Sequence, residues 1–345
     1  MECCCTASFY RFSIAPVSAN PQVEKASAMG GEKGTIAVIG SGLIGRAWSI
    51  CFARAGHKVK LHDVSKPALD AALGLIDGAL KELHESGLLD DPAAAKARIS
   101  TAATLEEALE GAVFVQENVK ETEEAKQEIF AAMDRLADPA AILASSSSNI
   151  RASLFTENLA GRARCLVAHP ANPPHLVPIV ELSPAPWTDP DVVARARALY
   201  EQAGMVPILV KKEIPGFILN RLQGALLAEA FKLVADGYAS TEDVDKTIKD
   251  GLGLRWSFMG PFETIDLNAP AGVADYIARY APMYWDMQHE QAQPRRWDKA
   301  LSDVLEGERR QALPADRLGE RQGWRDRRLM ALVAHKREAA KKIGE

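Results

Sequence analysis

Short apolar runs alternate with amphipathic segments along the first part of the chain. The apolar runs, each of which predicts a strand, are residues 35–39, 58–62, 99–103, 113–115 and 141–144. The segments between them repeat apolar residues every three or four positions, which predicts helices over residues 43–55, 66–86, 105–109 and 123–136. Strands that alternate with helices predict a parallel sheet covered on both faces, and right-handed crossovers make it a doubly wound, Rossmann-type α/β domain.

The rhythm changes after residue 212. Residues 214–235 form a long helical pattern, with Pro215 tolerated in its first turn, and Ser240 opens a predicted capping box. Almost no strand signal follows. We therefore predict an α/β domain over residues 34–212 and a smaller all-helical domain over residues 213–345. Residues 1–33 lack periodicity and the basic and apolar regions of a signal peptide, which indicates a disordered extension or a start codon assigned too far upstream.

Composition narrows the class of protein. The 345 residues are 47% hydrophobic and 25% charged, which is ordinary for a soluble globular chain. The net charge of −5 argues against a nucleic-acid partner, and no apolar run is long enough to cross a membrane. The five cysteines form neither a disulfide framework nor, with histidines, a spacing typical of a metal site. These features favour a cytoplasmic protein without a bound metal.

A glycine-rich loop lies between the first predicted strand and the first predicted helix. It reads Gly40-Ser41-Gly42-Leu43-Ile44-Gly45, the spacing of a dinucleotide fingerprint in the required context. In such a loop Gly40 permits the tight turn, Gly42 lets the backbone approach a pyrophosphate, and Gly45 allows close packing of helix on strand. The helix N-terminus, which includes Leu43 and Ile44, offers free N–H groups to phosphate.

Asp63 ends the second predicted strand, 23 residues after Gly40. A carboxylate there accepts hydrogen bonds from ribose hydroxyls and repels the 2′-phosphate of NADP, so NAD is the predicted cofactor. The Lys and Ser/Thr of a nucleotide-triphosphatase loop do not follow the glycines, which disfavours that class.

Three polar features follow later predicted strands, where open α/β sheets bind their ligands. They are the run Ser145–Asn149, His169 after the apolar residues 165–168, and Glu181 after residues 177–180. A proline-rich return between the last two would place His169 beside Glu181. A histidine paired with a carboxylate acts as a general base near neutral pH. Alternatives remain: a serine run also serves as a linker, and a lone buried histidine is more often structural.

This pairing predicts alcohol oxidation. His169 is the candidate base and Ser148 the candidate partner of the substrate hydroxyl. Asn220, on the first helix of the second domain, is expected to reach the same oxygen across the cleft.

With these residues the sequence resembles the 3-hydroxyacyl-CoA dehydrogenase superfamily, and within it the lambda-crystallin or L-gulonate 3-dehydrogenase branch. The resemblance covers about residues 34–335, and its motifs are GSGLIGRAW (40–48), ASSSSNI (144–150), HPANPPHLVPIVEL (169–182), GFILNRLQ (216–223) and DGLGLRWSFMGPFET (250–264). It implies a two-domain fold and a homodimer formed through the helical domains.

The resemblance also implies roles by position. Ser148 falls on the hydroxyl-binding serine, His169 on the base, Glu181 on its partner and Asn220 on the active-site asparagine. Glu121 and Lys126 match a loop near the nicotinamide ribose. The run Ser147-Ser148-Asn149 departs from the Thr-Ser-Cys common in the branch, which keeps the hydroxyl but changes its surroundings.

Arg255 bears on the substrate. The acyl-CoA enzymes of the superfamily lack an arginine before Met-Gly-Pro-Phe, whereas this chain has one, as in the lambda-crystallin pattern. A guanidinium in the cleft would hold a free carboxylate, which a thioester lacks. A surface or interface arginine is the alternative.

The leading hypothesis is NAD-dependent oxidation of a small free 3-hydroxy acid, similar to L-gulonate, to the 3-keto acid. A 3-hydroxyacyl-CoA dehydrogenase is the first alternative and an L-carnitine dehydrogenase the second. A structural, crystallin-like role is the alternative from another class, and the intact candidate site argues against it.

Overall fold

The computed structural model describes residues 33–344, so nearly all of the predicted N-terminal extension lies outside the described residues. Residues 34–345 form one compact unit, and the following description concerns that unit alone. No helix within residues 33–344 is both long enough and apolar enough to span a membrane.

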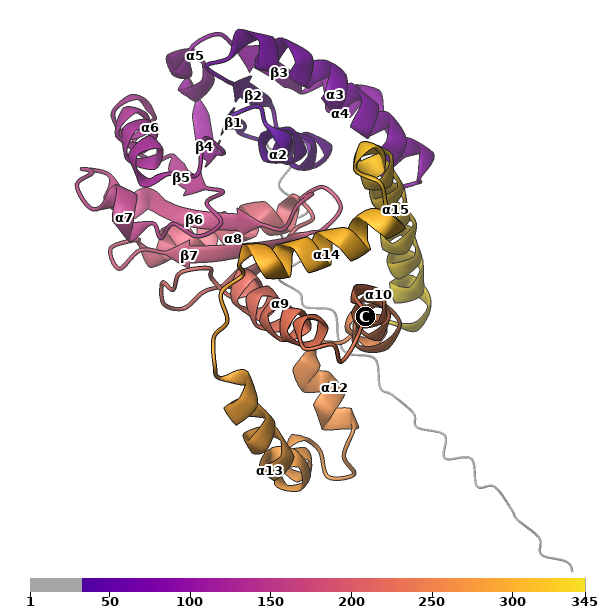
Figure 1. Cartoon of the computed structure of the whole chain (residues 1–345). Coiled ribbons are helices and arrows are strands. Elements are labelled where there is room, and N and C mark those ends of the chain that lie inside the picture. The colour runs from indigo at the N-terminus through magenta and orange to yellow at the C-terminus, as the bar shows by residue number, and fades with distance from the viewer. Residues whose placement is uncertain (1–32, 345) are drawn as a thin grey trace, which may run out of the picture. The chain divides into compact units, whose positions relative to one another are not determined.

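An eight-stranded sheet in the order β3-β2-β1-β4-β5-β6-β7-β8 forms the centre of the first half (Figure 1). Its strands are β1 (Thr35–Ile39), β2 (Val59–His62), β3 (Ile99–Ala102), β4 (Ala112–Glu117), β5 (Ile142–Ser145), β6 (Cys165–Pro170), β7 (Ile179–Pro184) and β8 (Val206–Leu209). Every neighbouring pair is parallel except β6 and β7. The predicted doubly wound sheet is therefore confirmed, with one antiparallel pair and the unpredicted strand β8.

Helices cover both faces of this sheet (Figure 1). They are α2 (Leu43–Arg54), α3 (Lys66–Glu85), α4 (Pro92–Ala97), α5 (Leu105–Leu109), α6 (Glu123–Leu136), α7 (Ser153–Thr156) and α8 (Pro190–Gln202), with a 3₁₀ turn at Arg162–Arg164. One buried cluster packs α2, α3 and α8 on the sheet, and the other packs α5, α6 and α7. Successive residues of a strand contribute alternately to the two clusters, because their side chains point to opposite faces of the sheet.

The order of the strands creates the crevice. The chain runs outward from β1 to β2 and β3, then returns to β4 on the other side of β1. In open α/β sheets such a reversal opens a ligand-binding crevice at the carboxyl ends of the strands. The glycine loop follows β1, and the serine run follows β5, at that same edge.

The second half consists of helices. These are α9 (Leu219–Ala235), α10 (Thr241–Lys246), a π-helical turn (Thr247–Leu252), α11 (Gly253–Trp256), α12 (Pro261–Leu267), α13 (Val273–Gln291), α14 (Lys299–Ala312), a 3₁₀ turn (Ala315–Arg317) and α15 (Leu318–Ile343). Ser240 caps α10 by accepting from the Asp243 N–H, as predicted. The exact boundary between residues 212 and 213 stays a prediction; it lies in the link between β8 and α9.

The start of α9 differs from the prediction. The helical pattern indicated a start near Ile214, but the helix begins at Leu219. Gly216 and Phe217 have φ angles of +76° and +50°, in the left-handed region that interrupts a helix. This turn brings the backbone N–H groups of Ile218 and Leu219 to the sheet, with consequences for the site.

Candidate active site

The glycine loop has the geometry of a phosphate cradle. Gly40 has a φ of +98°, and a side chain there would collide with the backbone of Asn118. At Gly45 a Cβ would lie 1.8 Å from the Gly40 carbonyl oxygen, which no larger residue tolerates. Gly42 instead faces open space, and no side chain caps α2. The first-turn N–H groups of α2 are thus available to a pyrophosphate.

Asp63 borders this loop. One carboxylate oxygen, Oδ2, accepts from the Ser41 N–H at 2.7 Å and the Ser41 hydroxyl at 2.8 Å, and Oδ1 accepts from the Ser65 N–H. Partial burial raises the pKa of Asp63, but these three hydrogen bonds outweigh it and leave the pKa below its ordinary value. A fixed negative charge therefore lies where a ribose would be recognised. The loop, the open face of Gly42 and this carboxylate fit NAD.

His169 and Glu181 are directly opposite each other in the antiparallel pair of β6 and β7. The His169 Nδ1 lies 2.8 Å from the Glu181 Oε2. The other oxygen, Oε1, accepts from the N–H groups of Ile218 and Leu219 at 2.8 and 2.9 Å. The first turn of α9 thus holds the carboxylate in place, and the carboxylate holds the imidazole.

The protonation states follow from these contacts. Burial raises the pKa of Glu181, but the hydrogen bonds from His169, Leu219 and Ile218 together lower it by more. The pKa of Glu181 is therefore below its ordinary value. An ionised carboxylate only accepts, so Nδ1 of His169 carries the proton and Nε2 has the free lone pair. The imidazole is 4% exposed and lies against the buried ring of Phe217 at 5.6 Å between centroids.

The serine run forms a tight turn around the Glu121 carboxylate. Oε1 of Glu121 accepts from the Ser147 hydroxyl at 2.7 Å, the Ser148 N–H at 2.7 Å and the Asn149 N–H at 3.2 Å. The Asn220 side-chain amide donates to the Ser148 carbonyl at 2.8 Å. The structure therefore brings Ser148 and Asn220 together, and Glu121 with them.

Lys126 is placed differently from a surface cofactor ligand. Its side chain is 1% exposed, and its ammonium lies 2.8 Å from Glu117 and 3.5 Å from Glu121. The sequence patterns gave no prediction for Glu117, and Ser145 and Ser147 were expected near the site only as members of the serine run. A glutamate at the end of an otherwise apolar strand is the signal that could have identified Glu117.

Arg255 lies on the short helix α11, with its side chain exposed. Among the described residues, no hydrogen bond or ion pair joins it to His169 or Glu181. Its charge instead lowers the pKa of Tyr276, although the hydrogen bond from Tyr284 raises that pKa more. The role of Arg255 as a clamp for a substrate carboxylate therefore stays a prediction.

Comparison with known proteins agrees with this geometry. Residues 35–214 match the NAD-binding domain of 3-hydroxyacyl-CoA dehydrogenase, and residues 216–312 match its C-terminal domain. Lambda-crystallin of Oryctolagus cuniculus is 39% identical over 88% of this chain and 97% of its own. L-carnitine dehydrogenase of Pseudomonas putida is 36% identical over 87% of this chain and 92% of its own.

Solved structures show the same fold. An NAD⁺-dependent dehydrogenase of 5-formyl-3-hydroxy-2-methylpyridine 4-carboxylic acid matches with a TM-score of 0.74 and 28% identity, over 87% of this chain and 97% of its own. The (S)-3-hydroxybutyryl-CoA dehydrogenase of Ralstonia eutropha has a TM-score of 0.60 and 27% identity, over 75% and 90%. The predicted NAD cofactor is confirmed by the match to the NAD-binding domain. The chain belongs to the 3-hydroxyacyl-CoA dehydrogenase family and is an NAD-dependent oxidoreductase that acts on a CH–OH group.

Proposed function

We propose that the protein oxidises a small free 3-hydroxy acid, L-gulonate or a relative, to the 3-keto acid. The observation that carries the proposal is the His169–Glu181 pair, whose histidine lies at the same edge of the sheet as the serine turn, because β5 and β6 are parallel neighbours. Such a pair is what removal of a hydroxyl proton requires.

The chemistry assigns a task to each residue. NAD, when bound, accepts the hydride from the hydroxyl-bearing carbon. Nε2 of His169 takes the hydroxyl proton, and the Glu181 carboxylate stabilises the imidazolium that forms. The Ser148 hydroxyl and the Asn220 amide orient the substrate oxygen. Gly40, Gly42, Leu43, Ile44, Gly45 and Asp63 hold the cofactor, and Glu121 borders its nicotinamide end.

Two observations favour a free acid over a thioester. Within residues 33–344, Arg255 forms no ion pair with a carboxylate, and its charge acts on Tyr276 nearby, which suits a substrate carboxylate. L-carnitine dehydrogenases are among the relatives, and L-carnitine is chemically a free 3-hydroxy acid. The alternative, a 3-hydroxyacyl-CoA substrate, is favoured by the family's own activity and by the Ralstonia relative. A purely structural, crystallin-like role has no need of the charged pair.

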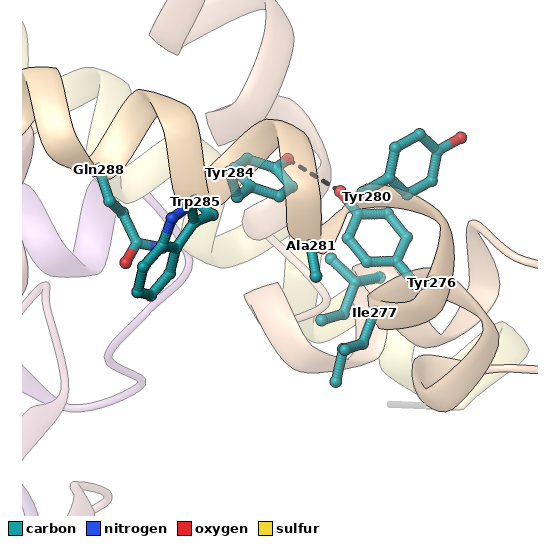
Figure 2. Close-up of a pocket in the computed structure, with 8 residues that line it drawn as sticks. Tyr276, Ile277, Tyr280, Ala281, Tyr284, Trp285 and Gln288 are labelled. Atoms are coloured by element: carbon teal, nitrogen blue, oxygen red, sulfur yellow. Dashed lines mark hydrogen bonds between the residues drawn. The ribbon is translucent and has the colours of Figure 1, made fainter.

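A second copy of the chain is the proposed partner, and the cytoplasm the proposed compartment. One face of α13 presents Tyr276, Ile277, Tyr280, Tyr284 and Trp285 around a shallow hollow, with Phe262 of α12 80% exposed nearby in the sequence (Figure 2). Large apolar patches of this kind mark protein interfaces. Arg255 borders this face, so a second copy bound there would add further groups around the Arg255 guanidinium.

A substrate panel tests the proposal. We expect kcat/KM with NAD for L-gulonate, L-carnitine or free 3-hydroxybutyrate to exceed that for 3-hydroxybutyryl-CoA by about tenfold or more, since a charged hydrogen bond contributes ~1.5–3 kcal/mol. A preference for the thioester would overturn the free-acid proposal and leave the oxidoreductase assignment intact. The variant Arg255→Met further distinguishes a free acid from a thioester as the substrate: it should raise KM for free acids alone.

A further inference from the structure

A buried ion pair lies under the serine turn, between β4 and α6. The Lys126 ammonium is 2.8 and 3.0 Å from the two carboxylate oxygens of Glu117, and the two side chains are 1% and 0% exposed. Glu117 also accepts from the Ser145 hydroxyl at 2.6 Å and from the Val119 N–H. The buried carboxylate is thus fully engaged by neighbouring donors.

This pair is connected to the site through one further carboxylate. The Lys126 ammonium lies 3.5 Å from Oε2 of Glu121, whose other oxygen accepts three hydrogen bonds from residues 147–149. The Ser148 carbonyl within that turn accepts from Asn220 of α9. An unbroken series of contacts therefore runs from the interior of the sheet to the candidate substrate-binding groups of both halves.

Stability alone is a weak reason for such a pair. Removing two charges from water costs free energy that their attraction often fails to recover, and apolar replacements of similar volume are frequently tolerated. Burial raises the pKa of Glu117, against which Lys126, Ser145 and the Val119 N–H act. What the pair does supply is geometry: a cation fixed at a point from which it faces the Glu121 carboxylate.

We propose that Glu117 and Lys126 are positioning residues, which hold Glu121 and through it the turn that presents Ser148 and the carbonyl bound by Asn220. This inference rests on the proposed role of Ser148 at the substrate hydroxyl. It assigns to Lys126 a supporting task beneath Glu121, from a position in which its side chain is 1% exposed.

The test is the double variant Glu117→Gln/Lys126→Met. It removes both charges at similar volume, so no unpaired buried charge remains to unfold the protein. The matched control is Asp134→Asn/Arg164→Met, which removes another largely buried pair, between Asp134 of the same helix α6 and Arg164 of the 3₁₀ turn; the side chains are 10% and 9% exposed and 2.9 Å apart. Asp134 and Arg164 lie outside the proposed catalytic and binding residues.

Two readouts are measured on the full chain. The first is amide hydrogen exchange at Ser148 and Asn149, which needs no substrate: it should accelerate at least about tenfold in the Glu117/Lys126 variant and stay unchanged in the control. The second is steady-state kinetics with NADH binding: kcat should fall about tenfold or more, with the Kd of NADH within about twofold of the wild type.

Each outcome decides the inference. Unchanged exchange and unchanged kcat would show that the pair is structural only, and a raised Kd of NADH with unchanged exchange would make Lys126 a cofactor ligand; both overturn the proposal. If amide exchange accelerates equally in the control, the cause is a general destabilisation of α6, and this result would also overturn the proposal. If the wild type oxidises no hydroxy acid in the panel, the proposed function fails, whereas the exchange result still decides whether the pair holds the turn.

Discussion

The proposed base His169 and the proposed ribose ligand Asp63 are each held by defined hydrogen-bond partners. Nδ1 of His169 faces Glu181, so only Nε2 can take a proton from a substrate. Asp63 is bound by three donors of the glycine loop and of the following turn. Neither side chain can change without altering a defined hydrogen bond.

Substituting His169→Ala should remove the base and leave the cofactor site, which lies on other strands. We expect kcat to fall by about 10²–10⁴, the usual contribution of a positioned base, with the Kd of NADH within about twofold. Steady-state turnover and NADH fluorescence titration measure the two quantities. Undiminished turnover would refute the role of His169 as base.

Substituting Asp63→Asn should keep the contacts to Ser41 in part but remove the charge that repels a 2′-phosphate. The kcat/KM ratio of NADP to NAD should rise about tenfold, which corresponds to ~1.4 kcal/mol of relieved repulsion. Asp70→Asn is the control, because that exposed carboxylate pairs with Lys66 away from the glycine loop. An unchanged ratio in the Asp63 variant would mean that other residues select the cofactor.

At the scale of elements, the junction of β7 with α9 joins the two halves through one carboxylate. Glu181 extends from the sheet to accept the N–H groups of Ile218 and Leu219, which lie at the start of the helix. A negative charge at a helix N-terminus is stabilised by the free N–H groups and by the helix dipole. The turn at Gly216 and Phe217 makes this approach possible.

The junction predicts a pH dependence of stability. The pKa of Glu181 in the folded protein is below its ordinary value of 4.5. The ionised carboxylate therefore stabilises the folded state at pH values above 4.5, and this stabilisation is lost as the pH falls through the folded pKa. Glu181→Gln should therefore lower the free energy of unfolding by ~1.5–3 kcal/mol at neutral pH, with the difference shrinking in acid. Urea unfolding at several pH values measures it. The exposed Glu82→Gln is the control; a constant difference at all pH values would contradict the prediction.

At the scale of the whole molecule, the helical half leaves a large apolar face open. Trp285 of α13 is 64% exposed beside Tyr280 and Tyr284, each 39% exposed (Figure 2). Isolated apolar side chains are common on surfaces, but a contiguous aromatic group is not. Arg255 borders this face, since its charge acts on Tyr276.

Placing a charge on this face should break the proposed dimer. We expect the wild type to sediment as a dimer and Trp285→Glu to sediment as a monomer at the same concentration. Ile343→Glu is the matched control, because Ile343 is also exposed, at 86%, but lies at the end of α15. A monomeric wild type would refute the dimer, and analytical ultracentrifugation gives the answer directly.

The sequence by itself determined the features that depend on neighbours along the chain. The strand and helix periodicities, the glycine loop, Asp63 and the cap at Ser240 are local patterns, so the predicted sheet and most helix bounds agree with the structure. The ends of α5 and α6 match the predicted residues. The pairing of His169 with Glu181 could also be predicted, because a short return joins their strands.

Only the tertiary structure decided the contacts between residues far apart in sequence. The N–H groups of α9 on Glu181, the turn around Glu121 and the buried pair of Glu117 with Lys126 arise from packing of separate elements. Along α15, Met330 is 2% exposed, whereas Leu332, two residues further on, is 44% exposed. Such choices depend on which surface meets the helix, and a local pattern contains no information about that surface.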